Sequence, residues 1–184
     1  MPVVGRAADN PFLGWLVIRI DVINEQTRVP VDADRLRAAL HSIVTAHGKH
    51  RGTISLAVVD DPTIHELNRR YLEHDYPTDV LSFAFDDDED TIEGEIIVSG
   101  DTAATTAGEY GWAAEDEMLL YVIHGGLHLV GFDDKSPADA ARMRAQESMH
   151  LASFGVRSRT AQVAVESVPS RVTEPRLLAE GRPS

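Results

Sequence analysis

Apolar and β-branched residues concentrate in short runs that predict four strands. The runs cover residues 15–22, 53–59, 79–85 and 94–99, and each is bounded by Gly, Pro, Asn or Asp. Such residues are enriched in strands, and Gly, Pro and Asp in the turns between them. The runs have the length of ordinary strands.

Apolar residues at helical spacing predict helices in the intervening segments. Segment 31–47 carries its apolar residues on one side of a helix, at Leu36, Ala39, Leu40, Ile43 and Val44. Segment 113–130 begins with three carboxylates, which favour a helix N-terminus, and continues with an apolar run. Further helices are expected over 61–71, 101–110 and 138–153. Because strands and helices do not alternate strictly, we expect an α+β fold, a single domain with a small mixed sheet of about four strands and four to five helices.

The chain of 184 residues is 43% hydrophobic, which suits one core. Residues 1–14 contain Pro, Gly and Asn and predict an irregular lead-in. The domain is expected over 15–156. Residues 157–184 contain several prolines and no apolar period, and they predict a disordered C-terminal tail. The five successive carboxylates at 86–90 predict a solvated loop, since they repel one another.

Composition restricts the chemistry and the location. The chain has no cysteine, so any metal site must use His, Asp or Glu. The apolar stretch 12–20 is short and contains Arg19, which argues against a signal peptide or a membrane span and favours a soluble, cytoplasmic protein. The net charge of −13 argues against bulk electrostatic binding of nucleic acid, although a local basic cleft is compatible with it.

The segment from His124 to Asp134 has the spacing of a metal site. His124 and His128 are four residues apart, so on a helix both imidazoles share one face. Gly131 is a natural helix stop that lets the chain reverse, and Asp134 then returns toward the histidines. Three protein ligands with an open fourth position are typical of a catalytic metal that activates water.

Other interpretations of this segment remain open. A His-x-x-x-His pair also occurs without a metal, as two polar or partly buried side chains. The common metalloprotease motif has a glutamate base after the first histidine, whereas this chain has Gly125, so a base would come from Asp133, Asp134 or the substrate. Two histidines and a carboxylate also form the site of non-haem iron oxygenases, but nothing else in the sequence indicates that scaffold.

Three blocks of sequence resemble the YbeY family of ribosomal RNA maturation endoribonucleases. The stretch His124 to Asp134 resembles the family's histidine pair, Leu-His-Leu-x-Gly, aromatic residue, and Asp followed by a third histidine. The second block is Glu66-Leu67-Asn68 through Tyr71, followed by Asp75-x-Pro77-Thr78-Asp79-Val80-Leu81-Ser82-Phe83; the third is Gly94-Glu95-Ile96-Ile97-Val98-Ser99. The resemblance spans about residues 15–154. Residues 75–83 also suit a plain structural role, as a turn before a buried strand.

The resemblance implies a zinc-dependent endoribonuclease, specific for single strands, that acts in ribosomal RNA maturation and small-subunit quality control. It implies one Zn²⁺, with another divalent transition metal as an alternative, and ribosomal RNA, the small ribosomal subunit and ribosome-associated proteins as partners. The catalytic group would be a metal-bound water, with Asp133 as a candidate side chain. Candidate substrate-binding residues are Arg69, Arg70, Thr78 and Ser82. The alternative is a non-catalytic ribosome-assembly factor with a structural metal.

Two positions depart from the family pattern. Asp134 stands where the family has its third metal histidine, and a carboxylate is an accepted zinc ligand. Leu72 stands where the family has an arginine that helps it handle phosphate. Arg69, Arg70 and His74 are near Leu72 in the sequence and are candidates to replace that arginine.

Overall fold

Four strands form one mixed sheet in the computed structural model of the chain, which describes residues 17–73, 75–85 and 89–157. The strands are β1 (Ile18–Asn24), β2 (Arg51–Val59), β3 (Val80–Ala84) and β4 (Thr91–Ser99), in the spatial order β1-β2-β4-β3. β2 runs parallel to β1 and β4, whereas β3 lies antiparallel to β4 at the edge of the sheet. The predicted α+β class and mixed sheet are confirmed.

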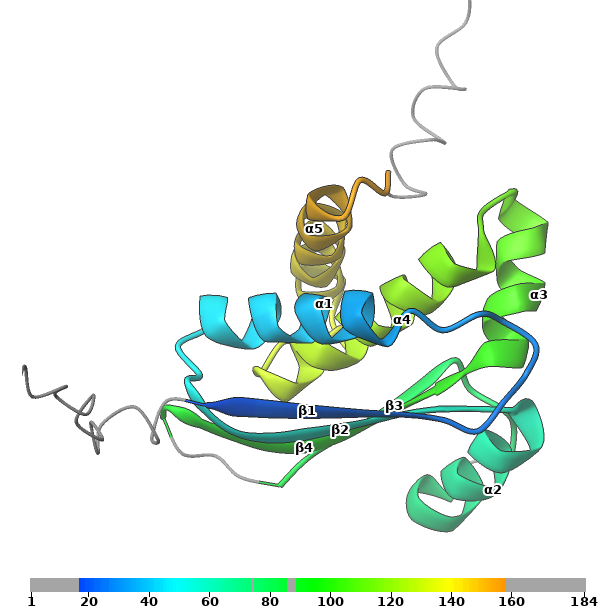
Figure 1. Ribbon diagram of the computed structural model, residues 1–184, viewed down its shortest axis with the longest axis horizontal. Coiled ribbons are helices and arrows are strands. Elements are labelled where there is room, and N and C mark those ends of the chain that lie inside the picture. Colours follow the sequence, from blue (N-terminus) through cyan, green and yellow to red (C-terminus); the bar gives the residue numbers. More distant parts are fainter. Residues whose placement is uncertain (1–16, 74, 86–88, 158–184) are drawn as a thin grey trace, which may run out of the picture.

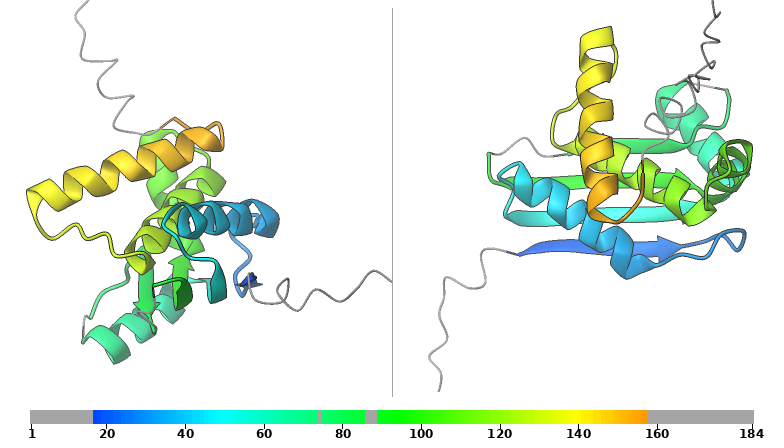
Figure 2. Two further views of the ribbon diagram at one scale, coloured as in Figure 1. Left: turned by 90° about the vertical axis from the view of Figure 1, so that its left-hand side faces the viewer. Right: turned by 90° about the horizontal axis from the view of Figure 1, so that it is seen from above.

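The described residues contain five helices, which lie on both faces of the sheet (Figure 1). They are α1 (Ala33–Ala46), α2 (Asp61–Leu72), α3 (Gly100–Tyr110), α4 (Ala114–Leu129) and α5 (Pro137–Ser153). α1 and α4 cover one face, α5 lies beyond them, and α2 lies on the opposite face. Seen from above, α5 runs across the direction of the strands (Figure 2). No helix among these residues has the length and hydropathy needed to cross a membrane.

Several sequence predictions concern residues outside the described ranges. These are the irregular lead-in 1–14, the beginning of the strand expected from residue 15, His74, most of the acidic run 86–90, and the tail from 158 onward. They stay predictions.

Two strands begin earlier than their apolar runs indicated. β2 begins at Arg51 and β4 at Thr91, and these two residues are partners in the parallel ladder. Hydrophobic patterning underestimates such strand ends, because backbone hydrogen bonds to a neighbouring strand can extend a strand through polar residues. Ladder pairing across the sheet therefore decided both boundaries.

The sheet separates a large core from a small one. Ile54, Leu56 and Val58 of β2 are fully buried in the large core with α1 and α4. Ile64 of α2 and Leu81 of β3 belong to the small core on the other face. The helix that carries both histidines therefore lies against the sheet in the centre of the molecule, which gives the site a rigid support.

Candidate metal centre

The C-terminal end of α4 brings three potential ligands together. His124 and His128 occupy successive turns of the helix, with their Nε2 atoms 3.0 Å apart. Asp134 follows in the turn after the helix, and its Oδ2 lies 3.9 Å from Nε2 of His124. One ligand atom from each of these residues lies within 4.8 Å of the others. The structure thus assembles the cluster that the spacing predicted.

A helix-ending motif places Asp134. Gly131 has a φ of 91°, a left-handed conformation that favours glycine. Its amide donates to the carbonyl of His128 at 3.0 Å, and the amide of Phe132 donates to the carbonyl of Leu127 at 3.0 Å. This pair of bonds is a Schellman motif, which reverses the chain directly after the helix. The predicted glycine stop is therefore the device that returns Asp134 toward α4.

Hydrogen bonds at the far side of each ring fix the two imidazoles. Nδ1 of His128 lies 2.9 Å from the carbonyl oxygen of Phe132, and Nδ1 of His124 lies 2.7 Å from a carboxylate oxygen of Glu147. A carbonyl oxygen and an ionised carboxylate only accept, so each Nδ1 carries a proton. In the neutral rings both Nε2 atoms then present lone pairs beside the carboxylate of Asp134. This convergence of three electron-pair donors fits a divalent cation.

The charges around His124 favour a positive group at this place. Burial alone would lower the pKa of His124, but the hydrogen bond and charge of Glu147, together with the charges of Asp79 and Asp134, outweigh burial and raise it. Without a metal, the imidazole therefore holds a second proton more readily than a free histidine. A metal ion would replace that proton.

Sequence reasoning did not identify Glu147. The residue belongs to α5, is 23 positions from His124, and its side chain is only 16% exposed. Met143, one turn earlier on α5, is buried in the large core and fastens the helix there. No local spacing reveals the Glu147 contact, because it depends on how α5 packs against α4.

Close packing around Gly125 leaves no room for the glutamate of the metalloprotease motif. A Cβ atom at position 125 would lie 2.9 Å from Cγ2 of Ile96 and 3.2 Å from Cγ2 of Val80. The position faces the sheet, where the glycine lets α4 approach closely. A glutamate there would collide with β3 and β4, so a base at this position is excluded on steric grounds.

An open cavity of about 520 Å³ lies beside the cluster. Its lining comes from the ends of α2 and α4, from β3 and from the turn between α4 and α5: Leu72, Val80, Leu81, Ser82, His128, Gly131, Phe132, Asp133, Asp134 and Lys135. The α2 and β3 side is mainly apolar, and the turn side is charged. The cluster is therefore open to a substrate on one side.

The predicted substrate-binding residues divide between the cavity and other places. Ser82 lines the cavity. Thr78 does not, and its hydroxyl donates to the Asp79 carboxylate at 3.1 Å, which also accepts from the amide of Val80. This bonding agrees with the structural interpretation of residues 75–83, as a turn that leads into β3.

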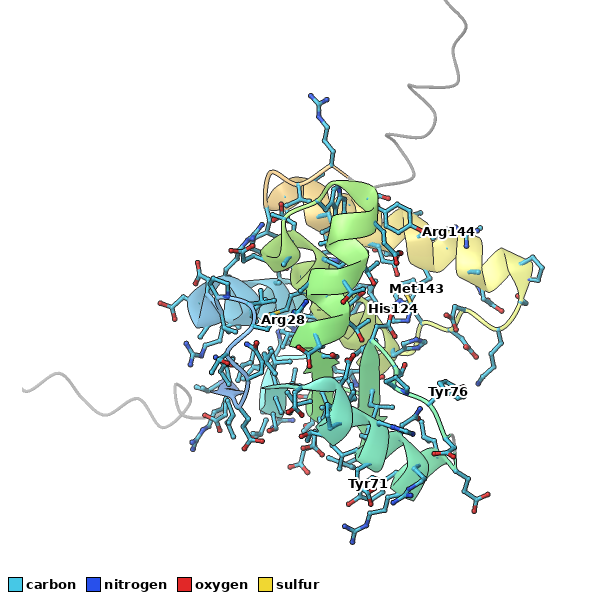
Figure 3. All side chains as sticks on the ribbon, turned by 90° about the vertical axis from the view of Figure 1, so that its right-hand side faces the viewer. Arg28, Tyr71, Tyr76, His124, Met143 and Arg144 are labelled. Atoms are coloured by element: carbon cyan, nitrogen blue, oxygen red, sulfur yellow. The ribbon has the colours of Figure 1, made fainter. Side chains whose placement is uncertain are left out.

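The two arginines of α2 lie outside the cavity lining. Arg69 forms an ion pair with Glu66 at 2.5 Å, and the Arg70 guanidinium lies 5.5 Å from the ring centre of Tyr71. In Figure 3, Tyr71 lies on α2 well apart from His124. In this conformation neither arginine side chain takes the place of the family arginine at the cavity.

Asp133 holds the turn together. Its Oδ1 accepts from the amide of Asp134 at 2.8 Å and from that of Lys135 at 3.3 Å. The bond from Asp134 is the main reason that the pKa of Asp133 is lowered. A carboxylate with a lowered pKa is a weak base, so its clearest role is to position the residues that follow it.

The family assignment follows from comparison with known proteins. A family profile described as Endoribonuclease YbeY matches residues 21–155 of the chain. The chain belongs to the YbeY family. The resemblance seen in the three sequence blocks is confirmed.

Curated relatives and a solved structure agree with this assignment. The Endoribonuclease YbeY of Rhodopirellula baltica is 41% identical over 123 residues, which is 66% of this chain but only 63% of that protein. That of Moorella thermoacetica is 39% identical over 150 residues, covering 73% of this chain and 96% of the relative. A solution structure from Thermotoga maritima is 26% identical, with a TM-score of 0.53, and covers 83% of this chain and 99% of its own.

Both departures from the YbeY signature lie at the same cavity. Asp134 provides the third potential ligand, and Leu72 also lines the cavity. The cavity of this chain therefore combines two imidazoles and one carboxylate with an apolar side chain at the place of the family arginine.

Proposed function

We propose that this chain is a metal-dependent endoribonuclease that cleaves single-stranded RNA in the maturation of ribosomal RNA. One observation carries the proposal: two imidazole Nε2 atoms and one carboxylate converge beside an open cavity. A purely structural metal site is usually closed by four protein ligands, whereas three ligands leave a position for a reacting group. The family name supplies RNA as the substrate class.

Each residue of the site has a defined task in this proposal. His124, His128 and Asp134 would hold the ion, while Glu147 and the Phe132 carbonyl orient the rings. The Ser82 hydroxyl is available in the cavity for a hydrogen bond to the substrate, and Asp133 fixes the turn. A divalent ion supplies Lewis-acid chemistry and activated water for phosphodiester hydrolysis. No side-chain base is assigned.

Zinc is the proposed metal. Imidazole nitrogen and carboxylate oxygen are both accepted zinc ligands, and the chain has no cysteine that could compete. Another divalent transition metal is the alternative, since imidazole also suits several of them.

The charge of the cavity makes RNA binding depend on the ion. Among the lining residues, Asp133 and Asp134 are negative and Lys135 is positive, so with neutral histidines the lining carries one net negative charge. A divalent ion would reverse that sign. Because phosphates avoid a negative cavity, we expect weak RNA binding after chelation.

Cleavage of an unstructured RNA by the full chain tests the proposal. We expect cleavage with added Zn²⁺, loss of cleavage with a chelator, and loss of cleavage in His128→Ala while circular dichroism shows a folded protein. Unchanged cleavage in the chelator would contradict metal dependence. A folded, metal-loaded wild type that binds small ribosomal subunits without cutting RNA would instead favour the assembly factor with a structural metal.

The proposed cellular setting is the cytoplasm, with ribosomal RNA, the small ribosomal subunit and its associated proteins as partners and quality control of that subunit as the process. The support is the family membership. Co-sedimentation of the chain with small subunits tests this setting separately from cleavage.

A further inference from the structure

Lys135 supplies a cationic side chain to the cavity lining. Lys135 is the only lysine or arginine among the described residues that line it. It follows Asp134 directly, in the turn between α4 and α5, and its side chain is 87% exposed. Lys135 therefore lines the cavity beside the third potential ligand.

The bonding of Lys135 fixes its backbone but leaves its ammonium exchangeable. The backbone amide donates to Oδ1 of Asp133, which holds the residue in the turn. The ammonium lies 3.2 Å from Oδ2 of the same carboxylate, in a highly exposed ion pair. Exposed pairs of this kind contribute little, so a phosphate oxygen can compete for the ammonium.

Among the described residues, the α2 and β3 side of the cavity offers no lysine or arginine. Leu72, at the end of α2, is 44% exposed and lines the cavity together with Val80 and Leu81. Arg69 and Arg70 are not among the residues that line the cavity; they contact Glu66 and Tyr71 on α2. A nucleotide has a charged phosphate and a base whose flat face can pack against apolar side chains, and the cavity has a charged and an apolar side to match them.

We propose that Lys135 binds a phosphate of single-stranded RNA at this cavity, with the attached base directed toward the Leu72 wall. The inference rests on the proposed function, because it names a contact to the same substrate. In this chain the phosphate-binding cation would then come from the α4–α5 turn, instead of from the α2 position that Leu72 occupies.

Two lysines in the chain allow a matched experiment. They are Lys135 and Lys49, and Lys49 lies outside the cavity lining. Binding of a 2′-O-methyl RNA oligonucleotide, checked by gel electrophoresis to remain intact, would be measured with Zn²⁺ at several salt concentrations for wild type, Lys135→Gln, Lys135→Arg and Lys49→Gln. Each phosphate contact to a single strand contributes about 0.7 to the slope of log K against log salt. We expect Lys135→Gln to lose about that much slope and to bind several-fold more weakly at low salt, while the other two variants stay near wild type.

Acetylation of the zinc-loaded protein provides a second readout. The oligonucleotide should protect Lys135 from an amine-reactive reagent and leave Lys49 reactive, as seen by peptide mass spectrometry. Equal salt slopes in wild type and Lys135→Gln, with no protection of Lys135, would overturn the inference about Lys135. If the wild type still binds the oligonucleotide in that case, the proposed function stands. A zinc-loaded wild type that binds no oligonucleotide would overturn both.

Discussion

Nδ1 of His124 on α4 lies 2.7 Å from Oε1 of Glu147 on α5. The contact links two helices and determines which ring nitrogen of His124 faces His128 and Asp134. With its proton on Nδ1, the ring directs the lone pair of Nε2 toward Asp134 and His128. Outer partners of this kind orient a metal ligand and raise its basicity.

Changing Glu147 should therefore weaken metal binding without touching a ligand. Removing such a partner typically lowers metal affinity about 10–100-fold. We expect Glu147→Ala to lose close to 100-fold in affinity, and Glu147→Gln, which keeps an acceptor oxygen, to lose close to 10-fold. Competition with a chromophoric chelator measures the affinity. Glu109→Gln on α3 is the charge-matched control, since residue 109 is exposed and lies outside the cavity lining. Equal affinities in all three variants would rule out the orienting role.

Asp134 is expected to act as the third ligand. Asp134→Ala should weaken metal binding by at least about 10-fold, because it removes a direct ligand, whereas Asp134→His should retain or strengthen binding by restoring three imidazoles. Asp133→Ala should reduce affinity less, since its carboxylate bonds the turn instead of facing the cluster. Wild-type affinity in Asp134→Ala would show that only the histidine pair binds the ion.

Metal uptake should release a proton from His124. Burial opposes protonation of this ring, but Glu147, Asp79 and Asp134 together raise its pKa above the ordinary value. Affinity should therefore rise with pH until the folded-state pKa is passed. The folding stability of the metal-free protein should instead fall as pH rises. The stabilisation from protonated His124 is complete below the pKa of the unfolded chain, about 6.5, and is lost as pH rises through the pKa of His124 in the folded protein.

Calorimetry of Zn²⁺ binding in buffers of different ionisation enthalpy counts the protons released, and NMR titration of the metal-free protein gives the His124 pKa. Glu147→Gln should lower that pKa, because it removes a negative charge beside the ring. A pKa at or below that of an exposed histidine in wild type would contradict the charge pattern.

Leu72→Arg restores the family residue in the cavity that Lys135 also lines. Because an added guanidinium there provides a second cation for phosphate, we expect tighter binding of uncleavable RNA and a salt slope about 0.7 steeper. Arg is flexible and Leu72 is partly exposed, so little change in stability is expected. The control is Ile23→Arg on β1, which adds the same charge at an exposed apolar residue outside the cavity lining. Equal gains in both variants would indicate a general charge effect.

Removal of residues 158–184 should leave thermal stability nearly unchanged. Val156 is buried and packs in the large core, whereas the sequence after Arg157 has no apolar period. A stop after Arg157 keeps that valine, and a stop after Ser153 removes it and should lower Tm. Differential scanning calorimetry compares the three proteins; a clearly lower Tm after the first truncation would refute the domain boundary.

The sequence by itself determined those features that depend on local spacing. Helical periodicity placed His124 and His128 on one face, and Gly131 indicated where the chain would reverse to return Asp134. Each of these relationships spans a few residues, so helix geometry and the conformational preference of glycine are sufficient to predict it.

Tertiary structure decided which distant residues join that cluster. Glu147 reaches His124 only because α5 packs against α4, and Leu72 lines the same cavity as Lys135 only because α2 ends beside the edge strand β3. Likewise, Arg69 and Arg70 are within three residues of Leu72 in the sequence, yet neither side chain lines the cavity. These outcomes depend on how whole helices and strands pack against the sheet. The spacing of residues along one segment does not show which residues of another segment will contact it.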